Sequence, residues 1–170
     1  MFHPGDRFTF GRLEIEVIRS RHSGGGSDGS VIDRPLTPPV KAHRYAEGGT
    51  YSLLVKHTNR KLLVGTPVDL PDVRADVIFL GVAAAGIPGN EEDYWREVWQ
   101  RAVVTTQAKR VIPIHWDDFG LPLDWGLHPL RLTDVGKVLQ LLQRLGHESK
   151  IDVACMPLWG RIDPLADLTP

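Results

Sequence analysis

The sequence predicts an α/β fold built on a mixed β-sheet, and three observations support it. Residues 7–18 alternate apolar and polar side chains, with Leu13, Ile15 and Val17 on one face, which is typical of paired antiparallel strands. The second half alternates apolar strands with amphipathic helices in the order β-α-β-α-β. The 170 residues are 42% hydrophobic and 24% charged, which predicts one soluble globular domain over residues 1–170.

The first elements are predicted to be hairpins and a core strand. After the hairpin at 7–18, two β-rich runs flank Thr58, Asn59 and Arg60 and predict a second hairpin. The run "DVIFLGV" from Asp76 is apolar throughout, which predicts a strand covered on both faces.

The later elements are predicted to be two helices and two strands. A helix is expected from Asn90, a good N-cap, because Trp95, Val98, Trp99 and Ala102 follow at helical spacing. Residues 110–115 are expected to form a strand, and Pro113 favours an edge or a bulge there. A second helix is expected from about Thr133 to Gly146, before a last strand at 150–156. Its predicted apolar stripe is Val135, Val138, Leu139, Leu142 and Leu145.

Residues 23–47 interrupt this regular pattern. The segment is rich in Gly, Ser and Pro, so we predict a long flexible loop within the domain. A loop of that length is usually a lid or a linker.

Charge and targeting signals exclude several classes of function. The chain carries 20 basic and 21 acidic side chains, a net charge of −1, and therefore lacks the electrostatic footprint of a protein that binds nucleic acid or an anionic membrane. The lone Cys155 cannot form an internal disulfide, and the N-terminal residues do not resemble a signal peptide. We expect a cytoplasmic protein without a membrane span.

Two of the seven histidines occupy distinctive positions. His22 and His115 each lie where an apolar strand gives way to a loop, which is where a rigid scaffold presents functional side chains. Either imidazole could alternatively satisfy a backbone carbonyl. Asp117 and Asp118 follow His115 directly, and they could orient an imidazole or simply cap a turn.

Four segments carry a resemblance to a known family. In order and spacing, "EVIRSRHSGGG", "EGGTYSLLVKHTNRKLLVGT", "ADVIFLGV" and "AKRVIPIHWDDF" resemble the C-terminal half of metallo-β-lactamase-fold hydrolases. The resemblance implies a half or incomplete αββα sandwich, with a mixed sheet and helices on one face. It also implies that His22 and His115 are metal ligands, with one or two zinc ions in the complete fold.

The sequence departs from the family pattern at two points. The His-x-His-x-Asp-His cluster that supplies most of the ligands is absent from these residues. Thr66 or Pro67 stands where the family has an acid, with Asp69 nearby but displaced. Four residues are candidates either to orient the metal ligands or to line the rim of the site: Thr66, Asp69, Asp117 and Asp118. By the resemblance, a loop over the substrate would contain Gly24, Gly25, Gly26 and His43.

The leading hypothesis is the C-terminal half of a zinc-dependent hydrolase, in which water attacks an ester, amide, lactone or phosphodiester bond of a small molecule. Because the matched positions offer two ligands where a catalytic zinc generally has three, the isolated chain is expected to bind zinc weakly or not at all and to be inactive. Its partner would be a missing N-terminal half or a second copy of itself. The alternative is a non-catalytic binding or interaction module on a degenerate fold of the same type.

Overall fold

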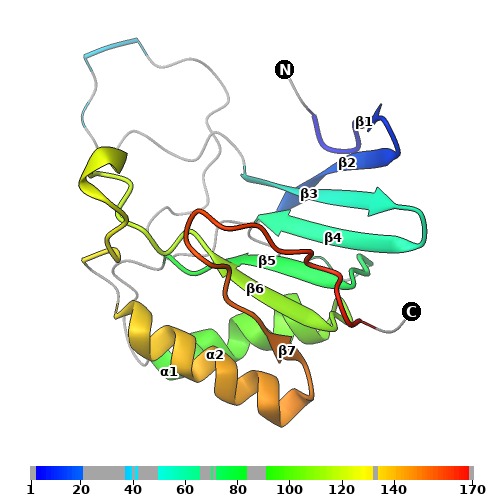
Figure 1. Ribbon diagram of the computed structural model, residues 1–170. Helices are drawn as coiled ribbons and strands as arrows, with labels where there is room; N and C mark the ends of the chain where they lie inside the picture. Colours follow the sequence, from blue (N-terminus) through cyan, green and yellow to red (C-terminus); the bar gives the residue numbers. More distant parts are fainter. Residues whose placement is uncertain are drawn as a thin grey trace.

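The computed structural model describes residues 3–20, 37–39, 41, 50–65, 70, 72–83, 91–131 and 134–168. Its strands form one seven-stranded sheet in chain order (Figure 1). Neighbouring strands are antiparallel from β1 to β4 and parallel from β4 to β7. The predicted mixed sheet is thereby confirmed. The strands are β1 Arg7–Phe10, β2 Leu13–Ser20, β3 Thr50–His57, β4 Arg60–Gly65, β5 Val77–Gly81, β6 Arg110–Ile114 and β7 Asp152–Val153.

Two helices cover the same face of this sheet. They are α1, Glu91–Val98, which continues into a π-helical segment at Trp99–Val104, and α2, Val135–Ser149. The strand register brings one row of side chains together on this face from β3 to β7. The row packs with the helices into one apolar core, so helices on one face are confirmed. The row consists of Leu54, Leu63, Ile78, Val111 and Val153.

The prediction that α2 ends at Gly146 was wrong. The helix continues to Ser149 and ends at Lys150, whose φ of 58° is left-handed. Gly146 is buried, and a Cβ there would lie 2.6 Å from Cγ2 of Val153 and 2.7 Å from the carbonyl oxygen of Ile151. The glycine therefore permits the close approach of α2 to β7. Leu141, rather than the predicted Leu139, belongs to the buried face.

The other face of the sheet is covered in part by the C-terminal segment, residues 154–168. Arg110 is in register with Val77, so its side chain lies on the face opposite to the helices. Its guanidinium donates hydrogen bonds to the carbonyl oxygens of Pro164 and Ala166, and Arg60 donates to that of Leu168. Figure 1 shows this segment, in red, crossing in front of the sheet.

Pro113 has no backbone N–H, and it lies at a place in β6 where a neighbouring strand would not accept a hydrogen bond from one. The carbonyl of Val111 accepts from Ala154 on the β7 side, and that of Ile114 accepts from Val82 on the β5 side. In a parallel strand these sides alternate along the chain, so Pro113 faces the β7 side. Because β7 pairs only with Arg110 and Val111, no described residue is a ladder partner on that side of β6 at Pro113.

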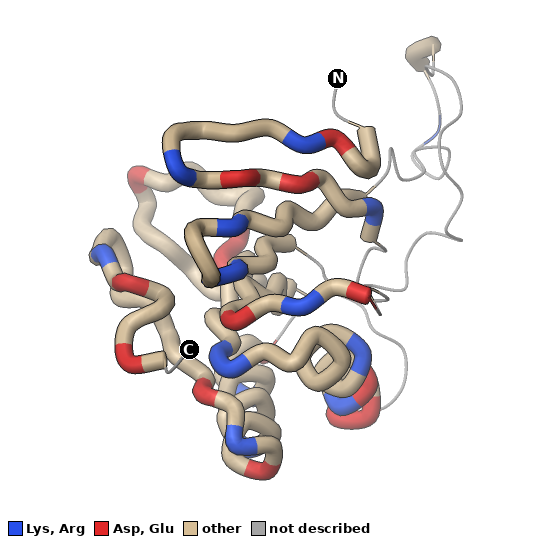
Figure 2. Tube along the Cα trace, turned by 90° about the vertical axis from the view of Figure 1, so that its right-hand side faces the viewer, with Lys and Arg blue, Asp and Glu red and all other residues tan. Residues whose placement is uncertain are grey.

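Charges are interspersed over the described residues. Figure 2 shows basic and acidic positions alternating along the strands and helices, without one side of a single sign. In the described part of the chain, no helix has the length and apolar character needed to cross a bilayer. Most of the predicted loop 23–47 lies outside the described residues.

Candidate functional site

Four strands end at one edge of the sheet. Because β3 is antiparallel to both β2 and β4, β2 runs in the same direction as β4, β5 and β6. The chain therefore leaves the sheet at the same edge after Ser20, Gly65, Gly81 and Ile114. Loops that leave one edge of a rigid sheet are where functional side chains commonly gather.

His115 comes directly after β6 at this edge. Its backbone is left-handed, with a φ of 57°, which turns the chain away from the strand direction. The imidazole is exposed, and its centroid lies 5.3 Å from that of Phe119, with the two rings inclined by 30°. The side chain is therefore stacked on an aromatic ring and open to solvent.

The loop after His115 is closed by main-chain contacts. We call residues 116–130 the His115 loop. Asp117 forms a bridge with Pro129, the Asp118 amide donates to the carbonyl oxygen of His128 at 2.7 Å, and the Leu130 amide donates to that of Trp116 at 3.0 Å. These contacts fix the two ends of the loop together.

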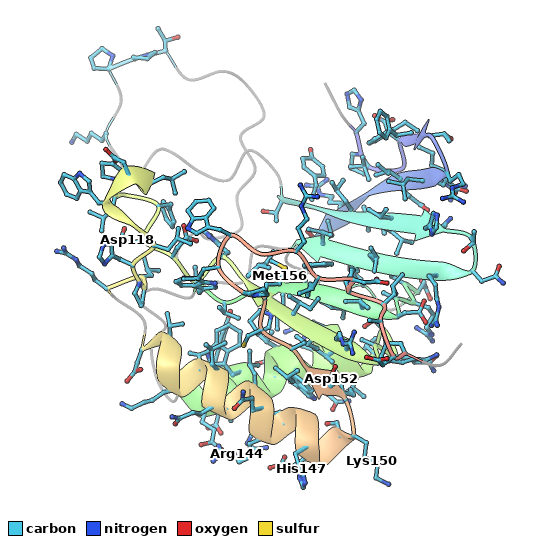
Figure 3. The ribbon with its side chains drawn as sticks, in the orientation of Figure 1. Asp118, Arg144, His147, Lys150, Asp152 and Met156 are labelled. Carbon is cyan, nitrogen blue, oxygen red and sulfur yellow. The ribbon has the colours of Figure 1, made fainter. Side chains whose placement is uncertain are left out.

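The two predicted rim acids lie within this loop. Asp118 accepts a hydrogen bond from the Gly120 amide on Oδ1 at 3.1 Å, so its carboxylate caps the turn that follows. Figure 3 places Asp118 at the end of the molecule away from Asp152 and Lys150. Asp117 is half-buried at the base of the loop. Whether either acid orients a metal ligand remains a prediction.

The other predicted site residues lie outside the described residues. These are His22, Gly24, Gly25, Gly26, His43, Thr66 and Asp69. Two of them can still be related to the sheet, because β2 ends two residues before His22 and β4 ends directly before Thr66. Strands β2 and β6 are four strand spacings apart in the sheet, or about 19 Å.

The structure also reveals polar groups at this edge that sequence reasoning missed. Among the described residues, the buried hydroxyl oxygens of Ser20 and Ser52 have no hydrogen-bond partner. Gly65 has a φ of 134°, and a Cβ there would lie 2.9 Å from Oγ of Ser52. Alternation in β3 places Ser52 on the helix-covered face, but nothing in the sequence indicated its contact with Gly65.

Comparisons with known proteins bear on the fold alone. No protein-family model matches the sequence, and no curated protein matches it. Among solved structures, CmlA, a diiron β-hydroxylase from Streptomyces venezuelae, is similar over 91% of this chain, with a TM-score of 0.52 and 12% identity. The metallo-β-lactamase fold protein YhfI from Bacillus subtilis matches over 91%, with a TM-score of 0.47 and 11% identity.

A proposed Zn-dependent hydrolase of the metallo-β-lactamase superfamily from Thermotoga maritima matches over 83% of this chain, with a TM-score of 0.43 and 17% identity. At a TM-score above 0.5, the similarity to CmlA shows that this chain shares the fold of part of that protein. It spans 57% of the Thermotoga protein, 51% of YhfI and 32% of CmlA. The predicted partial fold is therefore confirmed.

The described residues do not by themselves make a metal site of the metallo-β-lactamase type. Within the described part of the chain, no group of three or more His, Cys, Asp or Glu side chains could hold a metal ion. Among the described residues at this edge, His115 is the one imidazole that follows a strand, and Asp118 already accepts a hydrogen bond within its own turn. A metal would therefore need ligands from outside the described residues.

Proposed function

We propose that this chain supplies the C-terminal part of a metal-dependent hydrolase of the metallo-β-lactamase type, with zinc as the metal and a cytoplasmic location. The observation that supports it best is the position of His115, directly after the parallel strand β6 and at the edge where three other strands end. The substrate would be a small molecule with an ester, amide, lactone or phosphodiester bond. In this proposal His22 is a second ligand.

The chain's own residues would hold the imidazole in place. The left-handed backbone aims the side chain of His115 out of the strand, and Phe119 limits the rotation of its ring. The closed loop fixes Phe119 in turn. A ligand held in this way loses less side-chain entropy on binding than a free surface histidine does.

The remaining ligands are proposed to come from a partner. Because the chain spans about half of YhfI, we propose that a His-rich N-terminal half, or a second copy of this chain, completes the site. A single copy of the chain would then bind zinc weakly and would not hydrolyse substrate.

Metal binding by variants tests this proposal. His115→Ala should weaken Zn²⁺ binding by the chain, measured by equilibrium dialysis followed by metal analysis. His147→Ala is the matched control, because His147 is an exposed imidazole on α2. Equal zinc binding by wild type and His115→Ala would contradict the proposal. If an N-terminal half completes the site, zinc-dependent hydrolysis should appear only when that half is co-expressed with the chain; if a second copy completes it, hydrolysis should appear in the dimer of the chain.

A non-catalytic binding module is the second candidate. It is favoured by the lack of a metal-binding group among the described residues and by the large apolar side chains that the molecule exposes, including Trp125 and Trp159. This candidate predicts that co-expression with the N-terminal half yields a stable complex whose hydrolytic activity is not raised by zinc.

A further inference from the structure

The His115 loop exposes three large apolar side chains within seven residues. Phe119 is 71% exposed, Leu123 65% and Trp125 66%. Together they present roughly 400 Å² of surface to solvent, given the size of such side chains. Apolar surface concentrated in one place often marks a site of interaction.

These side chains are exposed by a loop that is held in shape. Besides the contacts at its base, the Trp125 amide donates to the carbonyl oxygen of Pro122 at 3.1 Å. The Nε2 atom of His128 lies 2.9 Å from the carbonyl oxygen of Trp125. The backbone is thus fixed by hydrogen bonds while the apolar side chains remain unpacked, and holding such a surface ready for a ligand lowers the entropy cost of binding.

The exposed surface adjoins the proposed metal ligand. One side of the Phe119 ring stacks on the imidazole of His115, and most of its surface is open. A molecule whose reactive group reaches His115 would therefore place its neighbouring substituent beside Phe119.

The charge of the loop selects against anions. The His115 loop contains Asp117, Asp118 and Asp124 but no lysine or arginine. Three carboxylates on one loop disfavour the binding of a phosphate group or an anionic lipid surface. The loop is therefore suited to a neutral apolar group.

The area is too small for a stable protein interface. Such interfaces bury about 800 Å² on each partner, whereas the three side chains offer roughly half of that. A small-molecule substituent, in contrast, can be covered by a few apolar side chains.

We propose that Phe119, Leu123 and Trp125 form an apolar lip beside His115 that binds an acyl or aryl substituent of the substrate. This inference rests on the proposed function and narrows it: the substrate is a neutral ester, amide or lactone with an apolar substituent, rather than a phosphodiester. Phe119 is a positioning residue in this proposal, because it contacts both the imidazole of His115 and the substituent.

The test is a titration of the full 170-residue chain with three probes. Octanamide carries a neutral head group and a long chain, acetamide lacks the chain, and octyl phosphate has the same chain with an anionic head group. Binding is followed by the indole N–H resonance of Trp125, assigned with Trp125→Phe. Octanamide should shift this resonance at lower concentration than octyl phosphate does, and acetamide should leave it unchanged. A preference for octyl phosphate would overturn the proposal.

Variants locate the binding. Phe119→Ser/Leu123→Ser should weaken octanamide binding about tenfold, since two apolar contacts are lost. Phe10→Ser is the matched control, because Phe10 is 77% exposed but lies on β1, the outermost strand on the side of the sheet far from β6. Equal octanamide binding by the double variant and by wild type would contradict the proposed lip. Self-association of wild type that is abolished in the double variant would contradict it too, because the apolar side chains would then bind a second copy of the chain. Circular dichroism checks that each variant is folded.

The outcomes separate this inference from the proposed function. If octanamide binds but His115 does not contribute to zinc binding, the apolar lip is supported and the metal site is rejected. If His115 contributes to zinc binding but octanamide does not bind, the metal site is supported and the lip is rejected.

Discussion

The two faces of the sheet are covered in different ways. On the helix-covered face, Leu63, Ile78 and Val111 are at most 1% exposed and pack against apolar side chains of α1 and α2. On the other face, Val77 and Ile112 are fully buried but Leu53 remains 38% exposed. There the C-terminal segment is held by arginine side chains that bond to its carbonyl groups.

The difference indicates where the free energy of unfolding resides. Apolar packing over a continuous core supplies most of the stability of a small domain, whereas a few hydrogen bonds at a partly exposed surface supply much less. We therefore expect the helix-covered face to open only with global unfolding. The C-terminal segment should be able to detach locally.

The largest effect is expected in the helix-packed core. Leu142→Ala removes a side chain that is fully buried in α2 and should lower the free energy of unfolding by about 3 kcal/mol, because it leaves a cavity. Leu53→Ala, on the open face, should cost less than about 1 kcal/mol, because Leu53 is already 38% exposed. Urea denaturation measures both. Equal losses would mean that the two faces are equally well packed.

The next effect concerns the contact between α2 and β7. Gly146→Ala should lower the free energy of unfolding by about 2 kcal/mol, because the added Cβ collides with Val153 and with the backbone of Ile151. Gly136→Ala is the matched control on the same helix. Its Cβ would meet nothing closer than 3.5 Å, and replacing glycine there should stabilise α2 by up to about 1 kcal/mol. A neutral Gly146→Ala would show that β7 can move away from α2.

A smaller effect is expected where the C-terminal segment is anchored. Arg110→Met removes both hydrogen bonds to the segment and the ion pair with Asp152, and should cost roughly 1 to 2 kcal/mol. Amide exchange at Ala166 and Leu168 should accelerate more than exchange in β5. Arg161→Met, in the same segment, is the control. Unchanged exchange at Ala166 would show that contacts other than those of Arg110 hold the segment.

The smallest effect is a pH dependence at the start of α2. The pKa of Asp134 lies below its ordinary value, first because the Lys137 amide donates to the carboxylate and then because of the Lys137 ammonium group. Because the pKa of Asp134 is lower in the folded state, its carboxylate stabilises the fold at neutral pH. This stabilisation is lost as the pH falls below the ordinary pKa of an aspartate and then through the lowered pKa of Asp134. Asp134→Asn should remove that part of the pH dependence of urea unfolding below pH 4. An unchanged profile would exclude a role for Asp134.

The sequence predicted what local patterns determine. Alternation along 13–17 and the run at 76–82 identified strands, and the spacing from Trp95 to Ala102 identified the first helix. The predicted helix end at Gly146 was wrong. A glycine that allows close packing against β7 cannot be told apart, in the sequence, from a glycine that ends a helix. The hydrogen bonds from Arg110 to the carbonyl oxygens of Pro164 and Ala166 could not be predicted, because they link positions more than fifty residues apart.

The candidate site was predictable only in part. The position of His115 at a strand end followed from the apolar run before it, and the structure places it there. Its stacking on Phe119 depends on how the His115 loop closes through Asp117 and Pro129. Such closure leaves no periodic signal in the sequence. Whether His22 joins His115 remains a prediction.

The short pairing between β6 and β7 has a consequence for the buried polar groups of β6. Past Val111, the side of β6 that faces β7 has no ladder partner among the described residues, and Pro113 is buried there. A backbone N–H that is buried without a hydrogen-bond partner costs free energy. Proline has no N–H to leave unsatisfied, so Pro113 avoids a penalty that a valine at this place would incur.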